Sequence, residues 1–414
     1  MTQQLHSHQF ENGLVLVAEP MDWLESAAFA VLLPAGYTRD PDGKLGLANF
    51  ACELIQRGSA DRDNRQFVED LDRLGTDRSA SVAASHSSFG AATLAENLFP
   101  SLQIFTDMIL QPHFPEDEVE DARQVCLQEL FAAEDELAQR TIQRLRHRHY
   151  GSPYGRRVQG DEASIRSFSR TDAVDFFRTH YRPDKAILSV AGKFEWPKLK
   201  DHIGSLLSEW QSVEVPDVTE HSPVFGYEHI PFESSQTHIA VAFPSIPYAD
   251  PNYFQARGAV GVLSDGMSSR LFTEVRENRG LCYTVYASCH SLKQRGSVVA
   301  YSSTSTDRAQ ETLDVLLHEL THLFEGIEQG ELDRLKARLK SSVVMQQESC
   351  AARCSSLASD WYHLRHMMTM DEIKGIIDGL TCESINHYLA NHPPERFTVV
   401  TLGEKQLEVG KYVS

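Results

Sequence analysis

The sequence predicts an α+β protein made of two homologous domains, each an antiparallel sheet flanked by helices. Strand patterns joined by turn residues precede helical patterns in both halves of the chain. Segments that begin at Thr171 and Thr381 repeat one order of elements, and a stretch rich in Pro, Ser and acidic residues separates the halves. We therefore expect an N-terminal domain at 1–212, a linker at 213–225 and a C-terminal domain at 226–414.

The strand predictions come from turn residues and apolar runs. In the first half, Asn12-Gly13 predicts a two-residue hairpin turn. "SAAFAVLLPAG" predicts a buried strand, and "SASVAASHSSFGAATL" predicts one long alternating strand. In the second half, "THIAVAFP", "LCYTVYASC" and "GSVVAYSST" predict three more strands.

The repeat carries the prediction of two homologous domains. "TDAVDFFRTHYRPDKAILSVAGK" and "TCESINHYLANHPPERFTVVTLGEK" each give an amphipathic helix, a proline, an apolar strand and a glycine. At an offset of 211 residues, Pro183 matches Pro394 and Gly192 matches Gly403. Upstream, both halves also contain a helix, a short break and a second helix that begins with acidic residues.

Composition excludes several classes of function. The chain has 414 residues and a formal net charge of −19, which repels nucleic acid. Seven cysteines without zinc-ribbon spacing favour reduced thiols. The N-terminal residues "MTQQLHSHQFENG" lack the pattern of a signal peptide, and no apolar run has the length of a membrane span. We therefore expect a cytoplasmic protein that contacts neither membrane nor nucleic acid.

The segment "GLANFACELIQRG" predicts an amphipathic helix with Gly58 as its C-cap. Asn49, Cys52 and Glu53 fall opposite the apolar stripe. From the residues alone, this face is interpreted as solvated polar surface. The apolar stripe consists of Leu47, Phe50, Ala51, Leu54 and Ile55.

Several segments carry a resemblance to a known family. They are "GLANFACE", "VEDLDRLG", "YGRRVQGDEASI", "HYRPDKAILSVAG" and "SSRLFTEVRENRGLCYTVYAS". Together they resemble the zinc peptidases with an inverted HxxEH motif, which include pitrilysin, insulin-degrading enzyme and mitochondrial processing peptidase. The resemblance covers nearly the whole chain and implies a duplicated domain that forms half of a clamshell chamber.

The zinc motif of that family is altered in this chain. The resemblance places Asn49 and Glu53 at the two zinc histidines, Cys52 at the general-base glutamate and Glu129 at the third ligand. Ala122 replaces a supporting glutamate. The change implies no metal cofactor of its own, with zinc expected in a partner subunit. A residual metal site of Cys52, Glu53 and Glu129 is the alternative.

A second family feature is present. Arg276 and Tyr283, seven residues apart in "VRENRGLCY", match the arginine and tyrosine that bind substrate and stabilise the oxyanion in the family. The resemblance therefore predicts a non-zinc subunit that binds peptide substrate. It would contribute Arg276 and Tyr283 to a heterodimeric zinc metalloendopeptidase, with an HxxEH-bearing homologue, or a second copy of itself, as partner.

Two other functions compete with this prediction. "HELTH" at 318–322 matches the HExxH motif of zinc proteases, but its helix reads as a packing helix with His318, Glu319 and His322 opposite the apolar stripe. A non-enzymatic structural, assembly or peptide-binding subunit, acting as a homodimer, is the other alternative. The basic run at 144–157 fits either an acidic partner or a solvated helix end.

Overall fold

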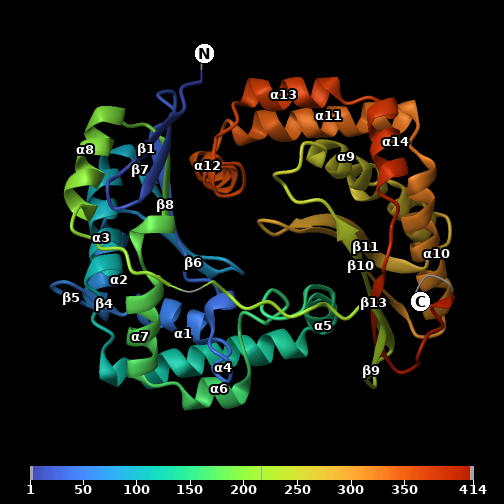
Figure 1. Ribbon diagram of the computed structural model, residues 1–414, viewed down its shortest axis with the longest axis horizontal. Helices are drawn as coiled ribbons and strands as arrows, with labels where there is room; N and C mark the ends of the chain where they lie inside the picture. Colours follow the sequence, from blue (N-terminus) through green and yellow to red (C-terminus); the bar gives the residue numbers. More distant parts are fainter. Residues whose placement is uncertain (1–2, 216, 411–414) are drawn as a thin grey trace. The chain divides into compact units, whose positions relative to one another are not determined.

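The chain folds into two compact units (Figure 1), described here by a computed structural model that covers residues 3–215 and 217–410. Unit 1 contains the described residues of 1–132 and 217–219, together with 156–215 and 344–369. Unit 2 contains 133–155, 220–343 and 370–410. Met1, Thr2, residues 411–414 and Pro216 of the predicted linker lie outside the described residues, and the described remainder of 211–225 forms neither helix nor strand.

Unit 1 is built on a six-stranded sheet. The neighbours pair in antiparallel fashion except β2 and β8, which run parallel. In spatial order the strands are β1 (His6–Gln9), β2 (Val15–Pro20), β8 (Ile187–Gly192), β3 (Ser26–Leu33), β7 (Ser87–Leu94) and β6 (Asp77–Val82).

Unit 2 repeats this plan with five strands. Here β13 and β9 form the parallel pair. In spatial order the strands are β11 (Cys282–Ser291), β12 (Gly296–Ser305), β10 (Gln236–Ser245), β13 (Thr398–Gly403) and β9 (Gly226–Pro231). The order β6-β7-β3-β8-β2 thus recurs as β11-β12-β10-β13-β9, which confirms the two homologous α+β domains.

The sheets differ from the prediction in one respect, because each contains a parallel pair. The strands β8 and β13 follow helices, so no hairpin forces them to run against β2 and β9. The two strands begin at Ile187 and Thr398, which differ by the predicted offset of 211. The helices before them begin in the same way, with capping boxes at Ser169 and Thr381.

Two local strand predictions were wrong. The loop at Asn12-Gly13 has three residues, since Phe10 N–H donates to Leu14 O at 2.9 Å, and of the pair only Gly13 has positive φ. The long alternating strand is a hairpin, β6 and β7, closed where Ala83 N–H donates to His86 O at 2.8 Å. In the sequence, the small polar residues at this turn continue the alternating pattern of a strand, so the pattern predicted one strand instead of two.

The helices complete both units. In unit 1 they are α1 (Leu47–Leu54), α2 (Asn64–Arg73), α3 (Leu98–Leu110), α4 (Val119–Asp135), α6 (Glu162–Ser167), α7 (Arg170–His180), α8 (Trp196–Leu207) and α12 (Cys350–Leu364), with α4 extending past the boundary at residue 132. In unit 2 they are α5 (Leu137–Tyr150), α9 (Tyr253–Ser264), α10 (Ala309–His322), α11 (Gln329–Gln346), α13 (Met370–Gly379) and α14 (Cys382–Asn391), with the end of α11 past residue 343. No helix in the described ranges has the length and apolar character needed to cross a membrane.

One helix of each sequence half belongs to the other unit. Helix α12, from the second half, packs on β8, β3 and β2 of unit 1. Helix α5, from the first half, packs on β10 and β13 of unit 2. The compact units are therefore discontinuous in sequence.

A buried ion pair fixes α12 on its sheet. Arg353 is fully buried, and its Nε and Nη2 each lie 2.7 Å from Oε2 of Glu19, on β2. Glu19 is 2% exposed and also accepts a hydrogen bond from Gln3. Ser189 Oγ donates to the carbonyl of Cys354 at 2.8 Å. Because both charges are buried, each requires the other as its partner.

Helix α5 is also joined to its sheet by ion pairs, which are partly exposed. Arg144 and Arg148 pair with Glu228 on β9 at 2.8 and 3.1 Å, so part of the predicted basic run is neutralised within the unit. His149 is buried between Thr398 Oγ1 at 3.0 Å and Ser297 Oγ at 2.8 Å. Burial lowers the pKa of His149 to about 4, so the ring is neutral at pH 7.

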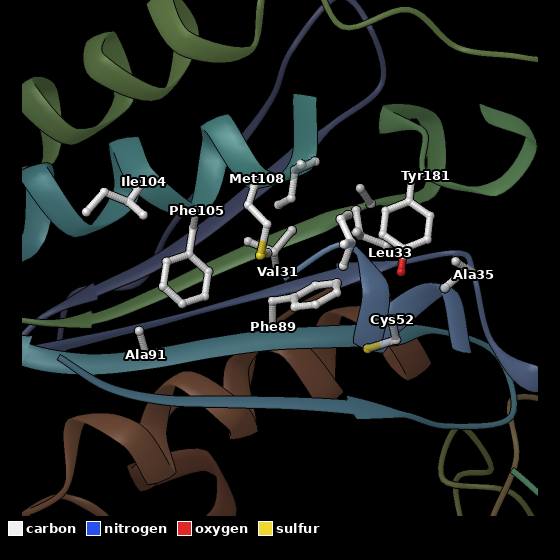
Figure 2. Packing of buried hydrophobic residues seen from close by; sticks show 14 of the residues in the cluster. Val31, Leu33, Ala35, Cys52, Phe89, Ala91, Ile104, Phe105, Met108 and Tyr181 are labelled. Carbon is white, nitrogen blue, oxygen red and sulfur yellow. The ribbon is translucent and has the colours of Figure 1, made fainter. Parts of the chain in front are cut away.

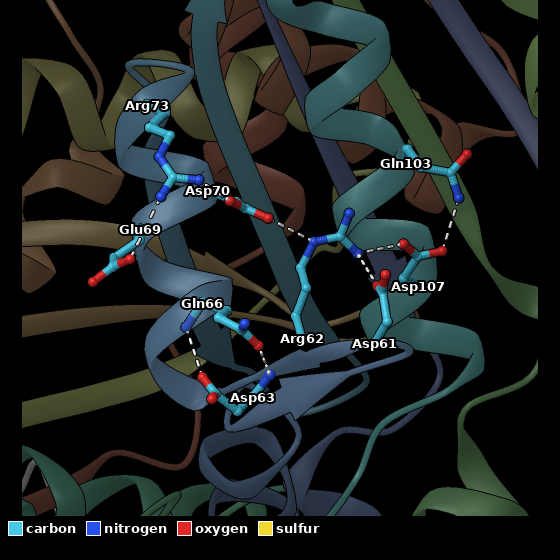
Figure 3. Close-up of polar contacts among 9 residues, drawn as sticks. All are labelled: Asp61, Arg62, Asp63, Gln66, Glu69, Asp70, Arg73, Gln103 and Asp107. Carbon is cyan, nitrogen blue, oxygen red and sulfur yellow. Dashed lines mark hydrogen bonds and ion pairs between the residues drawn. The ribbon is translucent and has the colours of Figure 1, made fainter.

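The core of unit 1 lies between its sheet and the helices on the opposite face from α12. Phe29 meets Phe105 edge to face at 4.9 Å between ring centroids, in the layer shown in Figure 2. Beside it, Arg62 joins two helices by pairing with Asp70 on α2 at 3.0 Å and Asp107 on α3 at 2.8 Å (Figure 3). These contacts join α2 to α3 and hold α3 against the sheet.

We expect Arg353→Met to lower the free energy of unfolding by about 3–5 kcal/mol, because it leaves the Glu19 carboxylate buried and unpaired. The double variant Glu19→Leu with Arg353→Met should regain most of this loss. Urea denaturation followed by circular dichroism measures both. Arg166→Met, which removes an exposed pair with Glu162, is the control and should cost under about 1 kcal/mol. A loss for Arg353→Met as small as the control's would contradict the role given to the pair.

We expect stability to fall as the pH drops from about 6.5 to about 4. The fold lowers the pKa of His149, so as the pH falls the unfolded chain binds a proton before the folded chain does. Protonation below the unfolded pKa therefore stabilises the unfolded state relative to the folded one. The contribution is on the order of 2–3 kcal/mol and is complete above pH 6.5. His149→Gln keeps an amide for Thr398 and Ser297 and should flatten this part of the profile; an unchanged slope in the variant would refute it.

Candidate functional site

The side chain of Asp40 caps the N-terminus of helix α1, which carries the altered zinc motif. The carboxylate of Asp40 accepts hydrogen bonds from Gly46 N–H and Ala48 N–H, both at 2.7 Å. Burial raises the pKa of Asp40 to about 7, against the opposing effect of these bonds. Gly46 has φ of 94°, and a side chain there would meet Gln159 O at 2.5 Å. The helix ends at Leu54, whereas Gly58, its predicted C-cap, opens the short strand β4 (Gly58–Ser59).

The predicted apolar stripe of α1 is buried, but the opposite face is only partly solvated. Asn49 and Glu53 are half-buried. Cys52 is only 4% exposed and belongs to the core cluster (Figure 2), so its placement on a solvated face was wrong. Burial, followed by the charges of Glu53 and Glu129, raises the pKa of the Cys52 thiol far above its usual range.

The structure brings Asn49 and Glu129 together. Nδ2 of Asn49 donates to Oε2 of Glu129 at 2.8 Å, and it lies 3.8 Å from Sγ of Cys126. Burial raises the pKa of Cys126 to about 12, so this thiol stays protonated. The amide therefore donates a hydrogen bond to one oxygen of the carboxylate that the family resemblance makes a metal ligand.

Glu53 has a different partner, which the sequence analysis missed. Arg57 lies one turn further along and pairs with Glu53 at 2.8 Å and with Glu118 at 2.6 Å. Its i,i+4 spacing from Glu53 was the signal available in the sequence. The guanidinium thus supplies the positive charge that balances Glu53.

These residues do not fit a zinc ion. Zinc in such sites takes neutral imidazoles, thiolates or carboxylates with free lone pairs. Here Asn49 points an N–H donor at Glu129, Cys52 is a buried protonated thiol and Glu53 is paired with Arg57. Within residues 3–215 and 217–410, no three His, Cys, Asp or Glu side chains are placed to hold a metal ion.

Arg276 and Tyr283 lie together in unit 2. Arg276 belongs to a π-helical segment, η5 (Phe272–Glu277), of a kind often found at functional sites. Its guanidinium lies 4.7 Å from the ring centroid of Tyr283 and 4.8 Å from that of Phe272. Arg276 forms no ion pair with any described residue, and Tyr283 is 80% exposed. Phe272, four residues before Arg276, was missed in the sequence. The rings of Phe272 and Tyr283, called the aromatic pair below, hold the Arg276 guanidinium beside the Tyr283 phenol, and both groups keep free N–H or O–H donors.

The "HELTH" helix is α10, and its histidines stack with 5.5 Å between ring centroids. His318 is exposed, as expected, and His322 is half-buried. Glu319 is buried, so its predicted exposure was wrong. Burial raises the pKa of Glu319, and Glu274 and Arg270 of the neighbouring segment are the nearby charges. Glu319 is buried because α10 packs against η5.

The duplicated α+β architecture and the altered HxxEH helix define a class, the peptidase-like proteins with two homologous domains. Residues 17–162 match the family described as Insulinase (Peptidase family M16), and residues 167–339 match the Peptidase M16 inactive domain. The chain belongs to peptidase family M16.

Individual relatives agree with this assignment. An uncharacterized zinc protease of Rickettsia felis is 24% identical over 387 residues, 93% of this chain and 94% of that protein. The uncharacterized zinc protease YmxG of Bacillus subtilis is 25% identical over 381 residues, 91% of this chain and 92% of that protein. A peptidase M16 inactive domain from Pseudomonas fluorescens shares the fold, with a TM-score of 0.90, 20% identity and coverage of 98% of this chain and 99% of the other. A protease from Helicobacter pylori has a TM-score of 0.84 at 19% identity, with coverage of 97% and 100%.

We expect the purified, untagged chain to contain far less than one zinc per molecule by mass spectrometry, and chelator to leave its melting temperature unchanged. The physical reason is the donor set at Asn49, Cys52 and Glu53. His318→Ala with His322→Ala removes adventitious binding at α10. The triple variant Asn49→His, Cys52→Glu and Glu53→His is the positive control for a restored motif. One tightly held zinc in the His318 and His322 double variant would contradict the assignment.

Proposed function

We propose that this chain is the non-zinc subunit of a heterodimeric metalloendopeptidase of family M16. The observation that carries the proposal is a contrast between two sets of side chains. At the zinc positions, Asn49 bonds to Glu129 and Glu53 pairs with Arg57, whereas Arg276 and Tyr283 form no hydrogen bond or ion pair with the described residues. The partner is a homologue with an intact HxxEH motif, which supplies zinc and the general base.

The role of Arg276 and Tyr283 is to bind the peptide and stabilise its reacting carbonyl. A guanidinium and a phenol donate to the oxygen that becomes negative when water attacks a peptide. The rings of Phe272 and Tyr283 limit the rotamers of Arg276, so less conformational entropy is lost when it engages substrate. The resemblance to heterodimeric members of the family supports this division between subunits.

Peptide binding has further support in unit 1. Strand β6 is an edge strand, and five of its six side chains are exposed. An edge strand without proline offers free backbone donors and acceptors to an extended peptide.

The state of the cysteines supports the predicted cytoplasmic location. All seven are unpaired thiols, as expected in a reducing compartment.

We expect the chain alone to be inactive and a mixture with an HxxEH-bearing homologue from the same organism to cleave a quenched fluorescent peptide. Arg276→Ala should lower kcat/KM of the mixture by about 10²-fold or more, as removal of one oxyanion donor does. Tyr283→Phe keeps the ring beside Arg276 and tests the hydroxyl alone.

The matched control is Arg279→Ala, which removes the same charge from an exposed arginine three residues further on. This variant should leave the activity of the mixture within about twofold of the parent, because Arg279 does not contact the rings of Phe272 and Tyr283 as Arg276 does. Equal activity of the Arg276→Ala and parent mixtures would refute the role of Arg276. A chain that binds peptide as a homodimer, without turnover in any mixture, would instead support the non-enzymatic alternative.

A further inference from the structure

Unit 2 contains an open pocket of about 560 Å³ away from Arg276 and the α10 histidines. Its walls are the end of α9, the loop 265–269 and one face of α11. The volume falls within the range of small-molecule sites. None of the residues in its lining belongs to the altered zinc helix or to the aromatic pair.

Two arginines on α11 give the pocket its charge. Arg334 and Arg338 line it one helical turn apart, and neither forms an ion pair or hydrogen bond with the described residues. Like charges at i,i+4 destabilise a helix by a few tenths of a kcal/mol. In a chain with a net charge of −19, two neighbouring arginines without an ion pair form a local positive site that suits a negatively charged ligand.

Neither carboxylate of the lining forms an ion pair with Arg334 or Arg338, although the charge of Arg334 helps to lower the pKa of Glu331. Asp265 pairs with Arg257 at 2.8 Å. Glu331 forms a two-point pair with Arg270, with Nε and Nη2 of the arginine at 2.7 and 2.8 Å. Both acids are thus held by other arginines, and Arg334 and Arg338 remain available to a ligand.

A buried hydroxyl also lines the pocket. Ser269 is 5% exposed, and its Oγ has no hydrogen-bond partner. A buried hydroxyl left without a partner costs about 1–3 kcal/mol, so an acceptor in the pocket would recover that loss. Ser269 therefore gives the pocket a neutral donor in addition to the two guanidiniums.

The glycines show that the pocket is closely built. Gly266 has φ of 109°, and a methyl group there would lie 2.6 Å from Nη1 of Arg338. Gly261 lets α11 approach α9, since a methyl group on it would lie 2.5 Å from Cδ1 of Leu335. The remaining wall is apolar, with Val262, Leu335 and the exposed Met267.

We propose that this pocket binds a small organic anion that joins an oxyanion to an apolar group. Arg334 and Arg338 bind the oxyanion, because guanidinium matches carboxylate and phosphate with paired N–H donors. Ser269 donates a further hydrogen bond, and Val262 and Leu335 cover the apolar part. A phosphate monoester and a carboxylate share this chemistry.

Calorimetric titration of the full chain tests the site with three probes: phenyl phosphate, 4-phenylbutyrate and inorganic phosphate. We expect at least one of the two aromatic anions to bind more tightly than inorganic phosphate, with a dissociation constant of about 1 mM or lower. Whichever aromatic probe binds more tightly identifies the oxyanion. Added salt should weaken binding, since the contact is ionic.

The variants separate ligand binding from folding. Arg338→Gln should weaken binding about tenfold, and the double variant Arg334→Gln with Arg338→Gln should abolish it. Ser269→Ala should weaken binding without lowering the melting temperature, because its Oγ has no partner in the fold. Arg178→Gln removes one exposed charge from α7 in unit 1 and should bind like the parent.

Three results would overturn the proposal. They are no binding of either aromatic anion at millimolar concentration, equal binding by the parent and the double arginine variant, and inorganic phosphate binding as tightly as the tighter of the two aromatic anions. The titration uses neither a partner subunit nor a peptidase assay, so its outcome is independent of the proposed function.

Discussion

The buried pair of Glu19 and Arg353 is the constraint on which the rest of the structure depends. A fully buried guanidinium must be paired, and its partner lies on β2, 334 residues earlier in the chain. Unit 1 is therefore incomplete until α12 has been made and docked. Unit 2 has the reverse dependence, because α5 comes from the first half and pairs with Glu228. Each sequence half supplies a helix that the other half's sheet requires, so neither half contains a whole unit.

The altered helix α1 shows how a metal-site scaffold is stabilised without a metal. A cluster of carboxylates beside a buried thiol requires positive charge or hydrogen-bond donors to offset repulsion and desolvation. Arg57 supplies charge to Glu53 and Glu118, and the Asn49 amide supplies a donor to Glu129. Asp40 still caps the helix through Gly46 and Ala48. The scaffold is thus retained, while each donor or charge points to a partner inside the protein.

The sequence predicted those features that local pattern and the internal repeat determine. The offset of 211 gave the duplicated order of helix and strand, and β8 and β13 begin at that offset, at Ile187 and Thr398. Features that depend on tertiary packing were missed. An amphipathic pattern says that α12 must be covered by something apolar, but not which sheet covers it. For the same reason, Cys52 and Glu319 read as exposed, although each faces a neighbouring element that periodicity cannot reveal.

Arg276 is the clearest case in which packing adds to what sequence spacing suggests. An exposed arginine without an acid partner costs little, so its lack of a pair alone is weak evidence for function. Its position beside two aromatic rings is stronger evidence, because the cation–π contacts offset the rotamer entropy that a long flexible side chain loses when it is held in one place. Tyr283 pays a further cost by exposing most of its ring to water. A surface that served folding alone would gain by burying that ring, whereas a surface that binds peptide gains by leaving it free.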